Sequence, residues 1–210
     1  MENKVICIEG QDGCGKTTQS QLLAKWLKEQ NYKTLLSREP GGAFIAEKIR
    51  DIIINNNNID NNATLLMLYA ARRENWVKCI KPAIMSNAYV VLDRFIISSI
   101  VYQALMQTDS SPEEQVNYIY QLHNDFIENF YPRITFILIS SVDNIQYSLE
   151  HSKKDRNILD NSNSISTLQK HYSNIHNYYN HDIKYIYTNN RNIQDIHQEI
   201  IQYLYEQKIV

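Results

Sequence analysis

Eight residues near the N-terminus have the types and the spacing that a phosphate-binding loop requires. Residues 10–17 read GQDGCGKT and fit the pattern G-x-x-x-x-G-K-[ST]. The glycines let backbone N–H groups turn inward around a phosphate, and the helix that follows presents its positive end to the same anion. Lys16 would bridge the β- and γ-phosphates of a nucleotide, and the Thr17 hydroxyl would ligate Mg2+. The predicted nucleotide site consists of Gly10, Gln11, Asp12, Gly13, Cys14, Gly15, Lys16, Thr17 and Thr18.

Two further polar clusters follow predicted strands. Asp93 and Arg94 come directly after an apolar run at 88–92, and a turn at 38–42 follows a run at 32–37. Ligands in open α/β sheets bind at the carboxyl ends of the strands, so we expect these clusters beside the phosphate loop. Asp93 could hold Mg2+ directly or through water, and Arg94 could pair with a phosphate through its planar guanidinium. The alternative for this pair is an ordinary surface ion pair.

Strands and helices alternate along the chain, which is typical of a parallel sheet covered by helices on both faces. The strands are predicted at 4–9, 32–37, 88–92, 133–139 and 183–187. Helices are predicted at 18–30, 43–54, 64–85 with a kink at Pro82, 97–106, 112–130, from 142, at about 164–179 and at 193–206, with Asp60 or Asn62 capping the third. The length of 210 residues suits one sizeable core. We therefore expect a single three-layer α/β domain over 1–210 with a five-stranded parallel sheet.

Composition and charge limit the partners and the compartment. The net charge of −2 argues against nonspecific nucleic-acid binding. The apolar runs are far shorter than the roughly 18 residues that span a membrane, and the N-terminus lacks the pattern of a secretory signal. Three cysteines without a C-x-x-C pair indicate reduced thiols in a cytoplasmic protein. Cys14 lies at a predicted helix N-terminus, which could lower the pKa of its thiol, but a bystander role is favoured.

Several segments resemble the bacterial thymidylate kinase family in their order and spacing. They are the phosphate loop, 38–42, 69–72, 80–83, and 93–95 with Ser98, Ser99, Tyr102 and Gln103. The sequence REPGG at 38–42 is far more specific than a phosphate loop, which many ATPases and GTPases share. The resemblance is strong from residue 5 to about 103 and loose from 134 onward. It implies a P-loop nucleotide kinase fold and a homodimer that transfers the γ-phosphate of ATP to dTMP, with Mg2+, in dTTP biosynthesis.

The resemblance implies roles for four side chains around the sugar and phosphate of dTMP. Asp12 would accept a hydrogen bond from the 3′-hydroxyl, and Arg38 and Arg94 would hold the acceptor phosphate. Arg50 would line the nucleoside pocket, unless it is a solvated helix charge. Because a nucleoside monophosphate presents an already ionised oxygen, the reaction needs alignment and charge neutralisation but no dedicated base.

Other side chains are implied to contact the thymine and its sugar. Arg72, Ser99 and Gln103 would read the polar edge of the base, and Tyr102 would pack by the deoxyribose and disfavour a 2′-hydroxyl. Leu68 departs from the family, which usually stacks a phenylalanine on thymine there, so a stacking contribution of about 0.5–1.5 kcal/mol would be reduced. The alternatives are a solvated helix charge for Arg72 and helix packing for Ser99 and Tyr102.

The resemblance is weakest in the predicted lid, at about 147–160. Relatives whose phosphate loop lacks arginine usually place several arginines in this segment before an Asp-Arg pair. This chain has Tyr147, Leu149 and His151 at those places and keeps Lys153, Lys154 and Arg156 as cations. Arg156 is therefore the lid candidate for contacting the ATP phosphates, and with Lys16 and Arg94 it completes the predicted catalytic set.

Two other functions stay open on the sequence alone. A deoxynucleoside kinase would share the phosphate loop and the Asp-Arg pair, but it needs a carboxylate base for a neutral 5′-hydroxyl, and Glu39 could serve. The second is a P-loop switch or an inactive nucleotide-binding protein, and the arginine-poor lid is the one feature that supports the inactive protein. A guanine-specific switch would be expected to show N-K-x-D near a late strand, and the chain has no such run.

Overall fold

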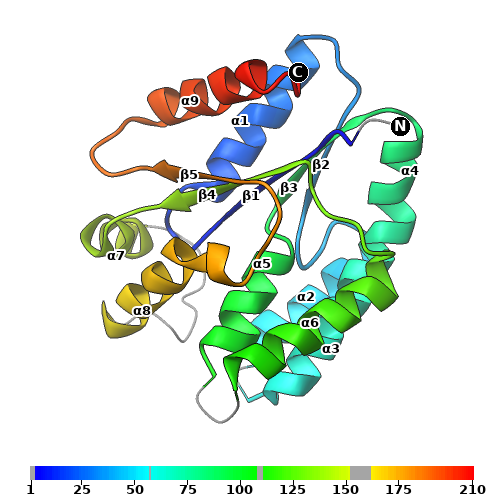
Figure 1. Cartoon of the computed structure of the whole chain (residues 1–210), viewed down its shortest axis with the longest axis vertical. Coiled ribbons are helices and arrows are strands. Elements are labelled where there is room, and N and C mark those ends of the chain that lie inside the picture. The colour runs from blue at the N-terminus through cyan, green and yellow to red at the C-terminus, as the bar shows by residue number, and fades with distance from the viewer. Residues whose placement is uncertain (1–2, 57, 108–110, 152–161) are drawn as a thin grey trace.

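Five parallel strands form the central sheet of the computed structural model, which describes residues 3–56, 58–107, 111–151 and 162–210. The strands are β1 (Val5–Gly10), β2 (Thr34–Arg38), β3 (Tyr89–Asp93), β4 (Ile134–Ile139) and β5 (Ile183–Tyr187). They lie in the order β2-β3-β1-β4-β5 (Figure 1). The predicted five-stranded parallel sheet is confirmed, with each boundary within two residues of its predicted place.

Helices cover both faces of the sheet. They are α1 (Lys16–Glu29), α2 (Phe44–Asn55), α3 (Asn61–Asn75), α4 (Lys81–Met85), α5 (Ile96–Ser99), α6 (Pro112–Ile127), α7 (Val142–His151), α8 (Ser162–Ser173) and α9 (Ile193–Glu206). Figure 1 shows α1 and α9 on one face and α3, α5 and α6 on the other. Alternate strand residues point to opposite faces, so Cys7 packs into the core beside α3 and α6, whereas Ile6 and Ile8 pack beside α1 and α9. In the described part of the chain, no helix combines the length and the apolar character needed to cross a membrane.

The strand register brings the predicted polar clusters to one edge of the sheet. Asp93 pairs with Ile8 of β1 and with Arg38 of β2, and Gly10 pairs with Leu138 of β4. The chain builds the sheet first on one side of β1 and then on the other, so the topological switch point lies at the carboxyl end of β1. The phosphate loop and both polar clusters therefore begin at this edge.

Two predicted helices contain a wider turn that the sequence analysis did not predict. The helix predicted at 64–85 is divided into α3, a π-turn at Trp76–Ile80 and α4. Pro82 lacks an N–H group, and in a regular helix its ring would clash with the carbonyl four residues earlier, which the wider turn relieves. The helix predicted at 97–106 likewise runs from α5 into a π-turn at Ile100–Leu105.

Several helix ends are set by individual residues. Asp60, rather than Asn62, caps α3, because its side chain accepts a hydrogen bond from the Ala63 N–H at 3.1 Å. Helix α6 ends at Ile127, earlier than predicted, because the next residue, Glu128, has a left-handed backbone with φ 58°. The helix predicted to reach 179 stops at Ser173 and is followed by a short 3-10 turn at Ile175–Asn177.

Candidate active site

The phosphate loop has the backbone geometry that its glycines predict. Gly10 has φ 141°, and a Cβ there would lie 2.6 Å from the carbonyl oxygen of Leu138, so only glycine fits. Gly15 has φ 98° and directly precedes α1. Lys16 is buried at the start of α1, and its Nζ donates to the Gln11 carbonyl at 2.8 Å. The lysine ammonium therefore lies against the loop that is expected to hold phosphates.

Thr17 and Asp93 meet beside this loop. The Thr17 hydroxyl donates to Asp93 Oδ2 at 2.6 Å. A hydroxyl oxygen and a carboxylate oxygen are hard ligands of the kind that Mg2+ prefers, so the two side chains fit the predicted ion. The structure thus brings together two residues that lie 76 positions apart in the sequence.

Arg94 extends into the same space from the end of β3. Its backbone has φ 74°, a conformation that is uncommon for a non-glycine residue and occurs often at functional sites. The guanidinium donates to Asp12 at 2.7 Å, to the Ser98 hydroxyl at 2.7 Å and to the Tyr172 hydroxyl at 3.2 Å. The protein itself therefore holds Arg94 beside the phosphate loop.

Glu9 and Tyr172 belong to this network, and sequence reasoning missed both. Glu9 is fully buried and accepts hydrogen bonds from the Phe95 N–H at 2.6 Å and from the Ser98 hydroxyl at 2.7 Å. Burial raises the pKa of Glu9, and Arg94 opposes that shift. The sequence contains one indication that Glu9 has a special role, namely a carboxylate within an otherwise apolar strand. No local signal marked Tyr172, which reaches Arg94 from α8.

Arg38 and Arg50 both form polar contacts with neighbouring residues. Arg38 forms an ion pair with Glu47 of α2 at 2.6 Å, and Glu47 also accepts from the Gly42 N–H at 2.7 Å. The hydrogen bond from Arg38 lowers the pKa of Glu47. Arg50 is half-buried and donates to the Pro40 carbonyl at 3.0 Å. The alternative reading of Arg50 as a solvated helix charge is therefore wrong.

Arg72 is buried as well, so its reading as a solvated helix charge is also wrong. The residue is 3% exposed, its Nε donates to Glu39 Oε2 at 2.5 Å, and Nη2 donates to the Ser99 hydroxyl at 3.1 Å. Burial raises the pKa of Glu39 to about 7, although the Arg72 guanidinium lowers it. Ser99 is thus a hydrogen-bonding partner of Arg72 and not a mere packing residue.

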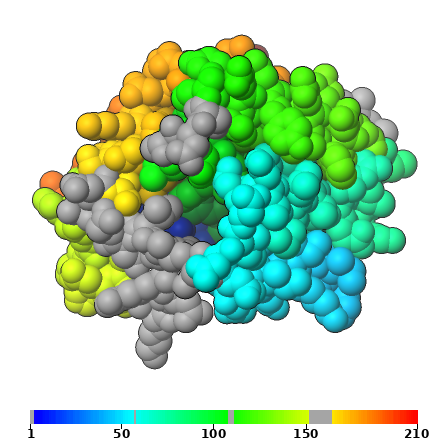
Figure 2. Space-filling model, turned by 90° about the horizontal axis from the view of Figure 1, so that it is seen from below, coloured from blue at the N-terminus to red at the C-terminus, as the bar shows by residue number. Residues whose placement is uncertain are grey.

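A single cleft joins these groups. Its volume of about 1190 Å³ exceeds the ~300–1,000 Å³ that usually hold one small ligand. Figure 2 shows it as a hollow with N-terminal residues, in blue, at its floor. The predicted site residues that line it are Asp12, Gly13, Cys14, Gly15, Lys16, Thr17, Thr18, Arg38, Arg50, Leu68, Arg72, Asp93, Arg94, Ser99, Tyr102 and Gln103. Gly10 and Gln11 are not among its lining residues.

The cleft continues into a connection that the sequence analysis did not single out. Thr188, Asn190, Arg191 and Ile193, between β5 and the start of α9, line it together with Gln19 of α1. The Gln19 Nε2 donates to the Ile193 carbonyl at 2.9 Å, which holds this connection against α1. No local motif marks these residues, because they join the site only through tertiary packing.

Cys14 is a buried thiol within the phosphate loop. This burial raises the pKa of its thiol more than Lys16 and Arg94 lower it. Desolvation of the thiolate outweighs the nearby positive charge, so the helix N-terminus does not activate the thiol, which agrees with the bystander role that the sequence favoured.

The predicted lid is described only as far as the end of α7. Tyr147 and Leu149 line the cleft, and the Tyr147 ring stacks on the ring of His151 with centroids 4.1 Å apart. The prediction for Arg156, with its neighbours Lys153 and Lys154, lies outside the described residues.

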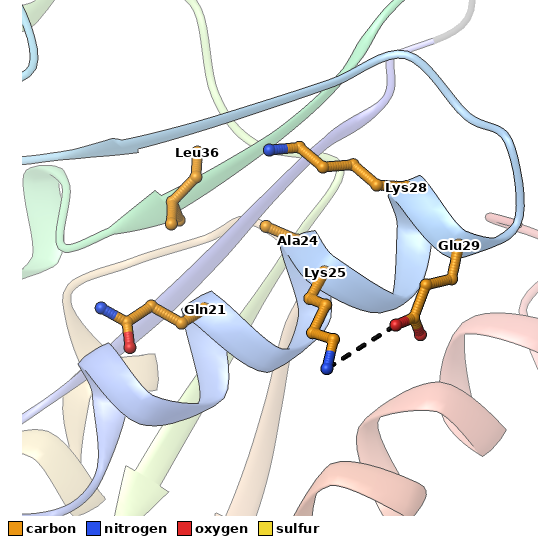
Figure 3. A pocket seen from close by; sticks show the side chains of 6 residues that line it. All are labelled: Gln21, Ala24, Lys25, Lys28, Glu29 and Leu36. Carbon is orange, nitrogen blue, oxygen red and sulfur yellow. Dashed lines mark ion pairs between the residues drawn. The ribbon is translucent and has the colours of Figure 1, made fainter.

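A second, smaller concavity lies between α1 and β2 (Figure 3). It is lined by Gln21, Ala24, Lys25, Lys28, Glu29 and Leu36. The Lys25–Glu29 ion pair at 3.7 Å is exposed, and this concavity shares no lining residue with the cleft. We assign it no role in the chemistry.

Comparison with known proteins identifies relatives of the chain. A family model described as thymidylate kinase matches residues 8–200. The chain belongs to the thymidylate kinase family. It is 42% identical over 153 residues to the thymidylate kinase of Ehrlichia chaffeensis (strain ATCC CRL-10679 / Arkansas), covering 71% of each chain. It is 48% identical over 104 residues to the thymidylate kinase of Thermoanaerobacter sp. (strain X514), covering 49% of this chain and 51% of the relative.

A solved thymidylate kinase structure extends the likeness to the whole fold. The crystal structure of the enzyme from Ehrlichia chaffeensis matches with a TM-score of 0.75 and 33% identity, covering 97% of this chain and 99% of that chain. Membership of the thymidylate kinase family makes the chain a nucleoside monophosphate kinase, a phosphotransferase whose family uses ATP as donor. The predicted family and P-loop kinase fold are confirmed.

Proposed function

We propose that this thymidylate kinase transfers the γ-phosphate of ATP to dTMP, yielding ADP and dTDP for dTTP synthesis. The observation that supports this most directly is one cleft that contains both a phosphate loop and a buried arginine. Lys16 and Thr17 line the cleft at the loop, where they would meet the phosphate donor. Arg72 and Ser99, both buried, suit a neutral base with hydrogen-bonding edges. A cleft larger than one ligand needs can hold both nucleotides.

Positively charged side chains would carry the catalysis. The acceptor oxygen of dTMP is already ionised, so no side chain has to remove a proton. Lys16 would neutralise charge on the donor phosphates, and Arg94 would neutralise the acceptor and the transferring group. Because Asp12, Ser98 and Tyr172 already hold the Arg94 guanidinium, little ordering of this side chain is needed during the reaction.

Thr17 and Asp93 would hold Mg2+. Thr17 donates its hydrogen to Asp93 at 2.6 Å, which leaves the lone pairs of the threonine oxygen for a metal ion. When bound, Mg2+ neutralises charge on the donor phosphates. ATP and Mg2+ are therefore the proposed cofactors.

The remaining side chains would position the acceptor nucleotide. Asp12, whose side chain is half exposed, would accept from the 3′-hydroxyl, and Arg38 would bind the phosphate with Arg94. The Tyr102 ring lies 5.5 Å from the Arg94 guanidinium, and in this proposal it packs by the deoxyribose and disfavours a 2′-hydroxyl. Arg50, Leu68 and Gln103 would complete the nucleoside pocket.

The position of Glu39 argues against a deoxynucleoside kinase. That reaction needs a carboxylate that can take the proton of a neutral 5′-hydroxyl. Glu39 is 4% exposed and its Oε2 is bonded to the Arg72 guanidinium, so the ion pair holds this carboxylate toward α3, which suits a counter-ion of Arg72 better than a base. The arrangement of Lys16, Arg94 and the Thr17–Asp93 pair likewise favours a catalyst over an inactive nucleotide-binding protein.

We also propose a homodimer formed through α2 and α3. Large apolar side chains on these helices are exposed: Phe44 by 75%, Ile45 by 47%, Ile52 by 50% and Leu66 by 50%. The helix predicted at 97–106 also has apolar residues, but it buries them in the core of its own chain. The free thiols of Cys7, Cys14 and Cys79 suit the cytoplasm, which we propose as the compartment.

The reaction is tested by product analysis. The purified chain is incubated with ATP, dTMP and Mg2+, and the nucleotides are separated by chromatography. We expect ADP and dTDP in equal amounts, no product with thymidine in place of dTMP, and no turnover in the presence of a chelator. Formation of dTMP from thymidine, or ADP release that does not depend on dTMP, would contradict the proposal.

A further inference from the structure

A buried carboxylate contacts the arginine that is proposed to read the base. Glu39 lies in the turn after β2, is 4% exposed, and its backbone N–H donates to the Asp93 carbonyl at 2.9 Å. Its side chain meets Arg72 of α3, which lies 33 positions later in the sequence. The backbone hydrogen bond to β3 fixes the place from which Glu39 reaches the arginine.

The guanidinium of Arg72 is held from several directions. Nε donates to Glu39 at 2.5 Å and Nη2 donates to Ser99 at 3.1 Å. The rings of Tyr69 and Phe95 lie 4.6 Å and 5.1 Å from the guanidinium carbon. Two hydrogen bonds in the plane of the guanidinium and two neighbouring rings leave little freedom to rotate. The direction in which Arg72 offers its N–H groups is therefore set by the protein.

Glu39 differs from the other partners in its charge. Tyr69, Phe95 and Ser99 are neutral, so ionised Glu39 supplies the negative charge in direct contact with this buried cation among the described residues. The guanidinium favours this ionised form, because it lowers the pKa of Glu39 against the effect of burial. A buried charge without a counter-ion is unstable and tends to find another partner. Without Glu39, Arg72 would lose the counter-ion that holds it, and its guanidinium would be free to reorient.

We propose that Glu39 is a positioning residue for base recognition: it fixes the direction in which Arg72 donates to the base and so sets the preference for thymine over cytosine. This inference rests on the proposed role of Arg72. A donor held in one direction matches the O4 carbonyl of thymine, whereas the amino group of cytosine at the same place is also a donor. Selectivity then depends on the carboxylate that prevents Arg72 from reorienting.

The first test is steady-state kinetics of Glu39→Gln, which keeps the size of the side chain and removes its charge. We expect KM for dTMP to rise about tenfold or more, with kcat at saturating dTMP and KM for ATP within about twofold of the parent. The ratio of kcat/KM for dTMP over dCMP should fall by a similar factor. Glu128→Gln is the matched control, since Glu128 pairs with Lys81 at 2.6 Å on the surface, outside the cleft, and it should change none of these values.

Glu39→Asp is measured under the same conditions as Glu39→Gln. The shorter aspartate keeps a carboxylate in the core but no longer reaches Nε of Arg72. Thermal unfolding identifies which variants fold, and the kinetics of those that do are compared. A rise in KM for dTMP in either folded variant, with kcat preserved, supports the inference. Unchanged KM for dTMP, or equal losses toward dTMP and ATP, would overturn it.

A double-mutant cycle separates this inference from the proposed role of Arg72. If Glu39 acts through Arg72, adding Glu39→Gln to Arg72→Ala should raise KM for dTMP less than twofold further. Additive effects would overturn the inference. If Arg72→Ala alone leaves KM for dTMP unchanged, the assignment of Arg72 fails. If Arg72→Ala raises KM and Glu39→Gln does not, only the positioning role fails.

Discussion

Three of the arginines proposed to bind the acceptor nucleotide each form an ion pair with a different carboxylate. Arg38, Arg72 and Arg94 pair with Glu47, Glu39 and Asp12, respectively. These pairs keep the guanidinium groups in place and reduce the net charge of the cleft. An incoming phosphate must therefore compete with Glu47 and Asp12, while a neutral base leaves the Arg72–Glu39 pair intact. This difference supports the proposal that Arg38 and Arg94 bind the phosphate and that Arg72 reads the base.

The sequence predicted these arginines but not most of their partners. Arg38 and Arg94 follow strands, and strand ends converge at one edge of a parallel sheet, so their place could be expected. Glu9, Tyr172 and the buried state of Glu39 could not be expected, because they depend on which side chains meet across the folded core. Such contacts leave no spacing pattern in the sequence.

Replacement of Lys16 by alanine should abolish phosphoryl transfer and leave dTMP binding largely unchanged. The ammonium lies against the phosphate loop at 2.8 Å from the Gln11 carbonyl and acts on the donor. Single-turnover kinetics and calorimetric titration of dTMP measure the two effects separately. Lys25→Ala, in the exposed pair with Glu29, is the control. A Lys16→Ala enzyme that kept more than about a tenth of the parental kcat would contradict the donor-site assignment.

Leu68→Phe should improve binding of dTMP. The leucine lines the cleft at the place where relatives are expected to stack a phenylalanine on the base. An aromatic stacking contribution of about 0.5–1.5 kcal/mol corresponds to a fall in KM for dTMP of about 2- to 10-fold, with KM for ATP unchanged. Steady-state kinetics with each substrate varied in turn checks this. A rise in KM for dTMP would show that Leu68 does not face the base.

At the scale of elements, strand positions were predicted more closely than helix interiors. The strands are short apolar runs between turns, and their limits are marked by glycine, proline and polar residues. The π-turns at Trp76–Ile80 and Ile100–Leu105 were missed, because the apolar pattern of a helix hardly changes when one turn widens. The second of these turns carries Tyr102 and Gln103 and so places both in the cleft.

Helix α6 carries a buried histidine that should make stability depend on pH. Burial lowers the pKa of His123 to about 3, and its Nε2 lies 2.6 Å from the Phe130 carbonyl, which can only accept. The ring is therefore neutral in the folded state, whereas the unfolded chain takes up a proton below pH ~6.5. Its contribution to stability is complete above that pH and declines as the pH falls from 6.5 toward 3.

His123→Gln keeps a donor for the Phe130 carbonyl and removes the titration. Between pH 7.5 and 5, the parent should lose about 2 kcal/mol more of its free energy of unfolding than this variant does. Urea unfolding at the two pH values measures the difference. His151→Gln, on the exposed surface of α7, is the control and should follow the parent. Parallel losses in the parent and in His123→Gln would contradict the assignment of a buried neutral ring.

At the scale of the whole molecule, the fold shows which apolar helix surfaces are buried in the core and which are exposed. Sequence periodicity could not distinguish the two. Ile97, Ile100 and Val101 pack into the core of their own chain. Phe44 and Leu66, on neighbouring helices, are exposed. Both kinds of helix have the same apolar pattern in the sequence. Only the three-dimensional structure shows whether other parts of the same chain cover the apolar face.

The proposed dimer can be tested with one charge on this exposed surface. Leu66→Glu should shift the mass measured by light scattering from twice that of one chain to that of one chain, because a carboxylate would be desolvated at the interface. Tyr187→Glu, at the end of β5 and also exposed, should leave the mass unchanged. A monomeric parent, or a dimer that persists in Leu66→Glu, would contradict an interface built on α2 and α3.

The central claim is that one cleft aligns ATP with a thymine nucleoside monophosphate. It is tested most directly by kcat/KM of the parent enzyme, from coupled ADP release, across dTMP, dUMP, dCMP, dGMP and thymidine. A site built to hydrogen-bond one base edge should favour dTMP over dCMP and dGMP by about a thousandfold or more, and thymidine should not be phosphorylated. Rates for dCMP or dGMP within tenfold of dTMP, or turnover of thymidine, would contradict the account.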